Sequence, residues 1–370
     1  MGVKVINASI PEADMALLKK AAAKLKRAEV EAHPLARYGY SGARIYVIKT
    51  PSFGKKAHLP HVVKIATPEE IEREIEGHRI AQNNIRNVKP GYEVRKNGSV
   101  AIFFQLVSDS DGKVVDAADV YEKCMRNEVD AKSTLLPLLG QSLDLLQTAH
   151  IVIKGQGGFY GDYLEEYTRP RRKSRASRMF ECGELEYGGT VVAKNPVLVL
   201  PELIVEEVGE FVTEVNHGDF HLSNIVVDRN ATNPCLIDFA WTKSGGHGLI
   251  DYAMLESSLR FMKFPTDVNP RLLLEIDQRL TRTLSVADAR ARINEIGDCD
   301  TRARLTAMID SVAVVREKMI DAFDEASNHS LWLEYNRVMF LVLAGQEKFE
   351  SFPLERTIVN LDYLRKQIGM

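Results

Sequence analysis

Residues 217–224 read His-Gly-Asp-Phe-His-Leu-Ser-Asn, and residues 236–239 read Leu-Ile-Asp-Phe. Asp219 precedes Asn224 by five positions and Asp238 by nineteen. Short apolar runs around a polar turn predict a hairpin between the two stretches, so the three polar side chains are expected on two loops beside it. Transfer of a phosphoryl group from a nucleotide needs a carboxylate at the acceptor hydroxyl and oxygen ligands for Mg²⁺. An Asp base, an Asn ligand and a second Asp ligand meet that requirement.

This pattern resembles the catalytic and metal-binding loops of the aminoglycoside phosphotransferase and choline kinase family, whose members are relatives of the protein kinases. In that family His-Gly-Asp is followed by an Asn, and then by a hydrophobic pair and an Asp. The resemblance implies that Asp219 is the catalytic base and that Asn224 and Asp238 hold Mg²⁺ beside the nucleotide, with Asn224 also acting in catalysis. Protein kinases prefer Arg where this chain has Gly218, so the small-molecule kinases are the closer group. A polar loop in which Asp and Asn serve turn geometry is the alternative.

A glycine-containing loop lies upstream, between two predicted strands. Residues 38–43 read Tyr-Gly-Tyr-Ser-Gly-Ala, and glycines in such a loop let backbone N–H groups approach phosphates. The residues expected to bind phosphate are Gly39, Ser41, Gly42 and Ala43. The match to G-x-G-x-x-G is incomplete, and an ordinary hairpin turn is the alternative. Some kinase-like domains of bacterial conflict systems carry a similar Gly-Tyr-Ser-Gly-Ala loop, which is a narrower resemblance.

Lys64 lies in the apolar run His-Val-Val-Lys-Ile-Ala at residues 61–66. It resembles the third-strand lysine that contacts nucleotide phosphates in this family, and a lysine on a solvated strand face is the alternative. The helix predicted after it offers several acids as partners, of which the candidates are Glu70, Glu74 and Glu76. We expect Glu74 to be the partner, because Ile71 and Ile75 mark the adjacent buried side of the helix.

Two further parts of the chain take a role from the resemblance. The strand predicted at residues 101–107 leads into the polar segment 108–113, which corresponds to the joint that binds the adenine in this fold. Gln105, Leu106 and Val107 are the candidate adenine contacts, and of these Gln105 and Val107 are the expected ones. Asp251 matches a family Asp that braces the catalytic loop, although a helix N-terminal acid is the alternative.

The order of predicted elements gives a β-rich part followed by a mainly helical part, and the resemblance implies that they form an α+β, bilobal, protein-kinase-like fold. It has a small antiparallel-sheet N-lobe with one helix and a larger, mainly helical C-lobe, with the nucleotide held in the cleft between the lobes. Helices are also expected at residues 12–31 and near 201–214. The expected domains are an N-terminal helical extension at 1–34, an N-lobe at 35–107, a C-lobe core at 108–264 with a basic insertion at 154–200, and a C-terminal helical subdomain at 265–370.

Composition bounds the class of protein and its surroundings. Hydrophobic residues make up 45% of the 370 residues and charged residues 27%, which excludes a disordered or fibrous chain. The net charge of −3 gives no bulk positive field for nucleic acid. The four cysteines are scattered and no apolar run approaches the ~18 residues of a membrane span, so we expect a cytoplasmic protein without a membrane partner. The basic run Arg169–Arg178 is either a solvated loop or a dock for an acidic or phosphorylated partner.

The expected reaction is transfer of the γ-phosphoryl group of ATP to a hydroxyl acceptor, with Mg²⁺ as cofactor. A small molecule rather than a protein is the expected acceptor; its identity, and the choice of ATP over GTP, stay open. The alternative is a pseudokinase or nucleotide-binding scaffold that presents its helices to a partner. Ala240, where kinases have the Gly of Asp-Phe-Gly, favours that alternative, whereas the intact Lys64 and Asp219 disfavour it. A third class is metal-dependent phosphoester hydrolysis, with His217 and His221 as metal ligands.

Overall fold

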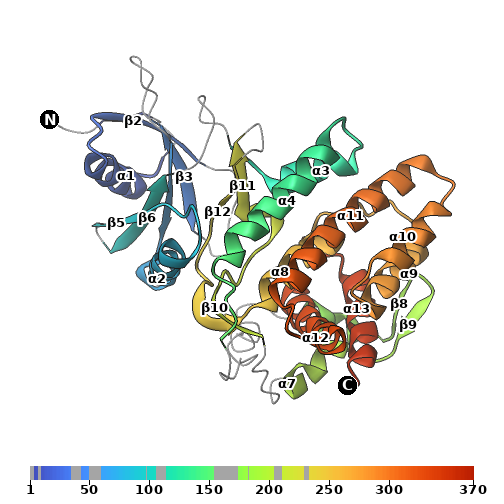
Figure 1. The fold of residues 1–370 in the computed structure, drawn as a ribbon. Helices are drawn as coiled ribbons and strands as arrows, with labels where there is room; N and C mark the ends of the chain where they lie inside the picture. Colours follow the sequence, from blue (N-terminus) through green and yellow to red (C-terminus); the bar gives the residue numbers. More distant parts are fainter. Residues whose placement is uncertain are drawn as a thin grey trace. The chain divides into compact units, whose positions relative to one another are not determined.

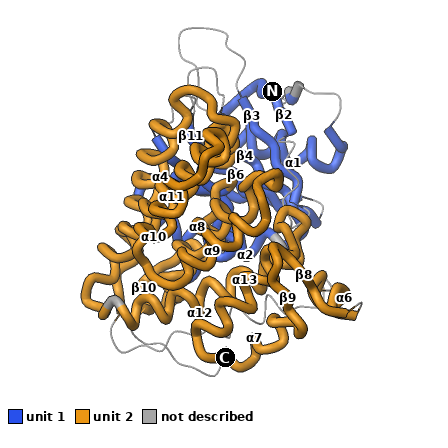
Figure 2. The backbone as a smooth tube through the Cα atoms, turned by 90° about the vertical axis from the view of Figure 1, so that its right-hand side faces the viewer, with its two compact units in different colours: residues 1–116, 224–243 blue, residues 117–223, 244–370 orange. Residues whose placement is uncertain are grey.

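The computed structural model describes residues 4–6, 10–34, 43–49, 60–96, 98–105, 114–153, 174–181, 183–203, 211–228 and 233–370. The chain divides into two compact units (Figure 2), the first formed by residues 1–116 and 224–243 and the second by residues 117–223 and 244–370. In the described part of the chain, no helix is both long and apolar enough to cross a membrane.

The first unit contains a six-stranded sheet in the order β1-β2-β3-β4-β6-β5 (Figure 1). Neighbouring strands are antiparallel except for the parallel pair β1–β2. The strands are β1 (Lys4–Ile6), β2 (Glu29–Pro34), β3 (Arg44–Lys49), β4 (His61–Ala66), β5 (Gly91–Lys96) and β6 (Ser99–Gln105). An antiparallel sheet in the N-terminal part of an α+β chain was expected from the sequence, and the structure confirms it.

Two helices cover opposite faces of this sheet. Helix α1 (Glu12–Lys24) packs Leu17 and Leu18 on the face that carries Tyr46 and Phe103. Helix α2 (Pro68–Asn84) packs on the other face, where its buried residues meet the side chains of β4 and β6; that cluster is Ala43, Ala66, Ile71, Val100 and Ile102. Because side chains alternate along a strand and Lys64 pairs with Ile102, Lys64 lies on the α2 face.

The N-terminal segment differs from the helical extension expected from the sequence. The helix predicted to reach residue 31 ends at Lys24, and Lys26 takes a left-handed φ of 56° that stops it. Glu29–Pro34 instead forms β2, which pairs with β3 and buries Val30 and Ala32 by strand alternation. The helical periodicity did not reveal this strand, because its stabilisation comes from pairing with a distant segment.

A small second sheet in the first unit lies between two of the motif residues, Asn224 and Asp238. Its order is β12-β11-β7, with β7 at Val114–Asp116, β11 at Ile225–Asp228 and β12 at Cys235–Leu236. Val226 and Cys235 pack against Val62 and Phe104 of the large sheet. Since Val62 and Lys64 are two residues apart on one strand, the β11–β12 hairpin lies on the same face as Lys64.

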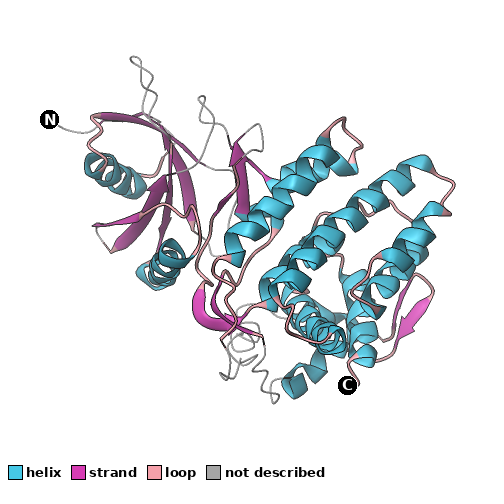
Figure 3. Cartoon of the chain, in the orientation of Figure 1, coloured by secondary structure: helices cyan, strands magenta, loops and turns pink. Residues whose placement is uncertain are grey.

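The second unit is mostly helical (Figure 3), as the sequence predicts for the C-terminal part. Its α-helices are α3 (Ala117–Met125), α4 (Ala131–Gln147), α6 (Arg175–Phe180), α7 (Leu200–Leu203), α8 (Leu249–Ser257), α9 (Pro270–Arg282), α10 (Ala287–Asn294), α11 (Cys299–Ala322), α12 (Asn328–Gln346) and α13 (Leu354–Gln367). The other elements are η1 (Pro196–Val199), η2 (Leu222–Asn224, at the junction of the units), the π-helix η3 (Ser258–Met262), β8 (Leu185–Tyr187), β9 (Thr190–Val192), β10 (Val212–Asn216) and β13 (Lys243–His247).

The helix expected near residues 201–214 is wrong over its second half. Of the residues described there, 201–203 belong to the short α7, and Val212–Asn216 forms β10, which pairs with β13. Val212, Thr213 and Val215 are buried β-branched residues, which favour a strand over a helix. This strand leads directly into the His-Gly-Asp loop.

Candidate functional site

Lys64 is held between two carboxylates inside the first unit. Its Nζ lies 2.6 Å from Glu74 Oε2 and 2.8 Å from Asp238 Oδ1, and the Lys64 and Glu74 side chains are buried. The structure therefore gives Lys64 the partner expected from the sequence, Glu74. Glu76 instead pairs with Arg79 on the exposed side of α2.

The neighbouring charges shift the pKa values of Lys64 and Glu74. Burial alone would lower the pKa of Lys64, but the carboxylates of Glu74 and Asp238 outweigh it and raise that pKa above its ordinary value. The ammonium therefore stays charged at neutral pH. Burial raises the pKa of Glu74 to about 7, while Lys64 opposes this rise and Asp238 adds to it. The cluster thus holds one permanent cation beside a carboxyl group that titrates near neutrality.

Glu74 also binds the backbone next to Asp238. Its second oxygen, Oε1, accepts a hydrogen bond of 2.9 Å from Phe239 N. Asp238 itself has a left-handed φ of 63°, a conformation that Asp tolerates better than most residues. One glutamate therefore fixes both the lysine and the backbone that follows Asp238.

Asn224 and Asp238 flank the hairpin formed by β11 and β12. Ile225 pairs with Leu236, and Ile237 N donates a hydrogen bond of 3.0 Å to the Asn224 carbonyl, so Asn224 lies beside the residue that precedes Asp238. Asn224 is buried, whereas the Asp238 side chain is 30% exposed. Amide and carboxylate oxygens, such as those of Asn224 and Asp238, are ligand types that fit Mg²⁺ together with a phosphate chain.

Asp219 belongs to the second unit, in a loop that Asp251 holds. Asp251 is fully buried and accepts hydrogen bonds from His217 N at 2.8 Å and Gly218 N at 2.7 Å. Gly218 has a φ of 79°, which favours glycine at this position. Asp251 therefore braces the loop, as the family resemblance implied. The Asp219 side chain is 27% exposed and lies 3.7 Å from His221 Nε2.

His150 is a member of this site that the sequence did not single out. It follows α4, and its Nε2 lies 2.9 Å from Asp251 Oδ2, while its Nδ1 lies 3.2 Å from the Tyr252 hydroxyl. A single histidine at the end of a helix carries no spacing signal, so only the tertiary structure reveals this contact. It completes the hydrogen bonding of Asp251.

The remaining expected positions fall into two groups, those outside the described residues and those placed elsewhere in the structure. Gly39, Ser41, Gly42 and Val107 lie outside the described residues. Ala43 packs its side chain in the core between the sheet and α2, and Gln105 ends β6 opposite His61. The histidines of the hydrolase alternative have partners within their own loop: His217 Nδ1 accepts from Asp219 N at 3.4 Å, and His221 Nδ1 accepts from Ser223 N at 3.2 Å.

The described end of the basic insertion packs against its own chain. Arg175 donates hydrogen bonds to the carbonyls of Phe349 at 2.5 Å and Phe352 at 3.2 Å. The Ala176 N–H donates to Glu347 Oε2 at 3.0 Å. Arg175 therefore anchors α6 to the segment after α12, and of the two described arginines in this run Arg178 is the exposed one.

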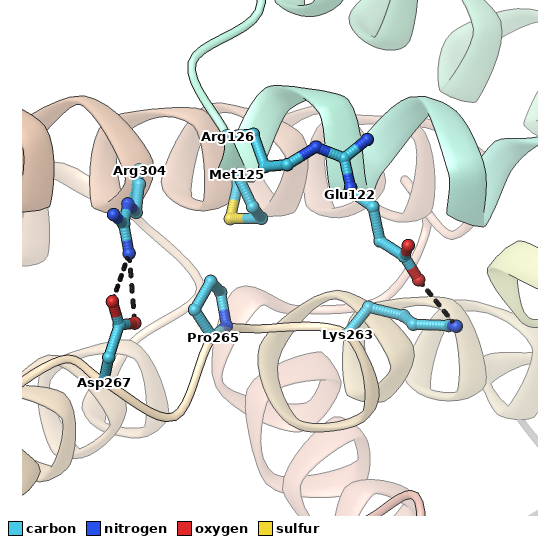
Figure 4. A pocket seen from close by; sticks show the side chains of 7 residues that line it. All are labelled: Glu122, Met125, Arg126, Lys263, Pro265, Asp267 and Arg304. Carbon is cyan, nitrogen blue, oxygen red and sulfur yellow. Dashed lines mark hydrogen bonds and ion pairs between the residues drawn. The ribbon is translucent and has the colours of Figure 1, made fainter.

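A surface cavity of about 480 Å³ lies in the second unit (Figure 4). Its lining includes two ion pairs, Arg304 with Asp267 at 2.9 Å and Lys263 with Glu122 at 2.9 Å. None of the residues that line it was expected to bind nucleotide or metal. The candidate functional residues therefore form two separate clusters, one around Lys64 in the first unit and one around Asp251 in the second.

The two units thus combine a sheet that carries a carboxylate-bound lysine with a helical part that carries a braced His-Gly-Asp loop. Residues 144–344 match the family described as Ternary complex associated domain 9, which is more than half of the chain. The chain belongs to this family. No curated protein matches the sequence.

Solved structures similar to this chain include three small-molecule kinases. An ethanolamine kinase from Plasmodium vivax is 13% identical, with a TM-score of 0.47 over 91% of this chain and 83% of the other. A choline kinase from Cryptosporidium parvum is 10% identical, with a TM-score of 0.45 over 92% and 90%. An aminoglycoside phosphotransferase from Streptomyces rimosus is 13% identical, with a TM-score of 0.41 over 81% and 98%.

Proposed function

We propose that this chain is a phosphotransferase that moves the γ-phosphoryl group of ATP to a hydroxyl group of a small molecule. The observation that carries the proposal is the contact of Lys64 with both Glu74 and Asp238, which lie 10 and 174 positions away in the sequence. Each of the three residues was expected at a nucleotide site from its own local motif. A phosphate-binding site of this kind requires such an arrangement, in which the Glu74 and Asp238 carboxylates both contact the buried ammonium of Lys64.

Lys64 is suited to hold phosphate oxygens. Its raised pKa keeps it charged, and phosphate can take the place that the Asp238 carboxylate occupies beside it. Asn224 and Asp238 would hold Mg²⁺, which neutralises the charge of the phosphate chain when it is bound. Glu74 keeps the lysine directed at this position through its 2.6 Å ion pair.

Asp219 is the residue to accept the proton of the attacking hydroxyl. The two backbone hydrogen bonds to Asp251 fix the loop just before Asp219, so the backbone that carries its carboxylate does not need to be ordered when the substrate binds. The partly exposed side chain is open to an acceptor. Positioning and charge stabilisation supply most of the catalysis in this reaction class, and these groups provide both.

The first experiment measures ATP binding with and without Mg²⁺, and then transfer from γ-labelled ATP to a pool of hydroxyl-bearing metabolites. We expect Asp219→Asn to lower the transfer rate by about 100-fold or more while ATP affinity changes little. Asp238→Asn should instead abolish the Mg²⁺-dependent part of ATP binding. Asp324→Asn, at an exposed position of the second unit, is the matched control and should behave as wild type. Transfer at the wild-type rate by Asp219→Asn would exclude the proposed base.

A nucleotide-binding scaffold is the second candidate. Two observations favour it: Ala240 departs from the kinase motif, and the family is described as associated with a ternary complex. The same titrations separate the two functions. A scaffold binds ATP with no transfer to any acceptor, and its nucleotide affinity depends on Lys64 but not on Asp219.

A further inference from the structure

One face of helix α2 lies against the segment that follows Asp238, and all of the contacts lie inside the first unit. Arg73, Glu74, Gly77 and His78 are spaced as two i, i+4 pairs, so they form a single stripe on the helix, which we call the α2 stripe. Glu74 accepts the Phe239 N–H, as described above. The His78 ring lies 5.2 Å from the Phe239 ring in an edge-on arrangement. The Arg73 guanidinium lies 5.2 Å from the centre of the Trp241 ring.

Gly77 is the point of closest approach. A Cβ atom built on it would lie 1.7 Å from the Phe239 carbonyl oxygen and 3.5 Å from Thr242 Cβ. The same carbonyl accepts a hydrogen bond of 3.0 Å from Thr242 N, which closes a tight turn. The obstacle is therefore backbone within a hydrogen-bonded turn, so a side chain at residue 77 could not be accommodated by a rotamer change.

A glycine inside a helix lowers the stability of that helix, so the presence of Gly77 needs an explanation from its surroundings. Glycine destabilises a helix interior relative to alanine, because the unfolded chain loses more conformational freedom. Gly140, inside α4, shows the opposite environment, since a Cβ there would meet only Val314 Cγ1 at 4.0 Å. Of these two helix-interior glycines, only Gly77 is required by the space around it.

We propose that the α2 stripe, through the missing side chain of Gly77, is the positioning surface that sets Asp238 for cation binding. This inference rests on the proposed function. Any side chain at residue 77 would push Phe239 away from the helix, because the carbonyl is already inside the space of a Cβ. The hydrogen bond from Phe239 N to Glu74 Oε1, now 2.9 Å, would then be stretched beyond its range. Asp238 precedes Phe239 directly, so its carboxylate would move relative to Lys64.

The test compares Gly77→Ala with Gly140→Ala, which make the same chemical change in two helices. ATP affinity is measured by calorimetry in Mg²⁺ and again in EDTA. We expect Gly77→Ala to reduce the gain in affinity that Mg²⁺ confers by roughly 10- to 100-fold, as a displacement of about 1 Å can do. Affinity in EDTA, which depends on Lys64, should change much less. Gly140→Ala should keep both affinities and an unfolding midpoint at or above that of wild type. An unchanged Mg²⁺ gain in Gly77→Ala would overturn the inference.

A second measurement needs no nucleotide. The chain has two tryptophans, so a Trp332→Phe background leaves Trp241 as the reporter of the segment. Gly77→Ala should shift its emission and its accessibility to a quencher, and Gly140→Ala should not. Arg73→Ala, at an exposed position, removes the contact with Trp241 without adding atoms, and serves if Gly77→Ala does not fold. We expect Arg73→Ala to alter the Trp241 emission and to reduce the gain in ATP affinity that Mg²⁺ confers. A Trp241 signal unaffected by these changes would refute the positioning surface.

The two proposals fail in different ways. If wild type binds no ATP, the phosphotransferase proposal is lost, whereas a shifted Trp241 signal in Gly77→Ala still supports the role of the α2 stripe in placing the segment. If wild type binds Mg²⁺ and ATP together but Gly77→Ala does so equally well, the positioning role is lost and the function stands.

Discussion

Lys64 shows how one residue depends on the packing of three elements. A buried ammonium is costly unless it is paired and hydrogen-bonded. Its two carboxylates come from α2 and from the segment after β12, so the charge is compensated only when both pack on the same face of the sheet. Removing Lys64 would leave Glu74 and Asp238 as neighbouring acids with no cation between them. The lysine therefore has a structural as well as a functional role.

Glu74 should give the protein a pH dependence of stability near neutrality. Burial raises its folded pKa to about 7 from the ordinary 4.5. Between pH 4.5 and about 7 the folded chain keeps a proton on Glu74 that the unfolded chain releases. The stabilisation that this proton gives the folded state is fully present below the unfolded pKa of 4.5 and is lost as the pH rises through 7. The slope from this group is at most about 1.4 kcal/mol per pH unit. Urea unfolding from about pH 5 to about pH 8 measures it, and Glu74→Gln should flatten the curve.

Glu334 is a second buried carboxyl group that would add its own pH dependence of stability in the same range. Burial raises its pKa to about 7 as well, but it lies in the second unit, paired with His247 at 3.0 Å. The contribution of Glu74 is therefore the difference between the wild-type and Glu74→Gln curves of unfolding free energy against pH. An equal slope of these two curves would show that Glu74 is not the source of the pH dependence.

At the scale of elements, a buried charge network joins the helices of the second unit. Glu256, at the end of α8, contacts Arg260 and Arg316 at 2.8 Å each, and the Tyr335 hydroxyl donates to it at 2.8 Å. Arg260 continues to Asp277 of α9. The arginines and the hydroxyl lower the pKa of Glu256 to about 2 in spite of its burial. One carboxylate therefore connects α8, η3, α11 and α12.

We expect Glu256→Gln to destabilise the second unit by about 3–5 kcal/mol, because it leaves buried arginines without a carboxylate. Chemical denaturation at neutral pH measures the loss. The wild-type contribution is fully present above the unfolded pKa of 4.5 and is lost as the pH falls toward 2, so the gap between the proteins should narrow in acid. Glu317→Gln, a change elsewhere on α11, should alter stability by much less. A similar loss in both variants would show that the network is not the cause.

The elements also show what the sequence could and could not predict. Strands β4 and β6 were found because their apolar runs are local signals, and this placed Lys64 beside the helix that supplies Glu74. Strand β2 was missed because its alternation is short and its partner, β3, is separated from it by residues 35–43. His150 and Gly77 were missed because each is defined by a contact with a distant segment. Local patterns report propensity, whereas close approach between segments appears only in the folded chain.

At the scale of the whole molecule, each unit has its own core. In the first unit, α1 packs on the sheet through its buried Asp14. The Asp14 carboxylate accepts hydrogen bonds from Arg44 Nε at 2.6 Å and from the Tyr46 hydroxyl at 2.6 Å. The second is organised around the network of Glu256. A chain built of two compact units need not unfold in one step, because each core can be lost separately.

We therefore expect unfolding in two transitions that respond to different substitutions. Asp14→Ala removes the acceptor of two hydrogen-bonding side chains and should destabilise the first unit by about 2–3 kcal/mol, without affecting the second. Glu256→Gln should do the reverse, and Glu12→Ala, at the exposed start of α1, should change neither. Scanning calorimetry gives the transitions, and hydrogen exchange read by mass spectrometry assigns them to residues 1–116 and 224–243 or to the remainder. If Asp14→Ala accelerated exchange equally in both sets of peptides, the units would unfold as one, and the stability of the lysine cluster could not be changed independently of the His-Gly-Asp loop.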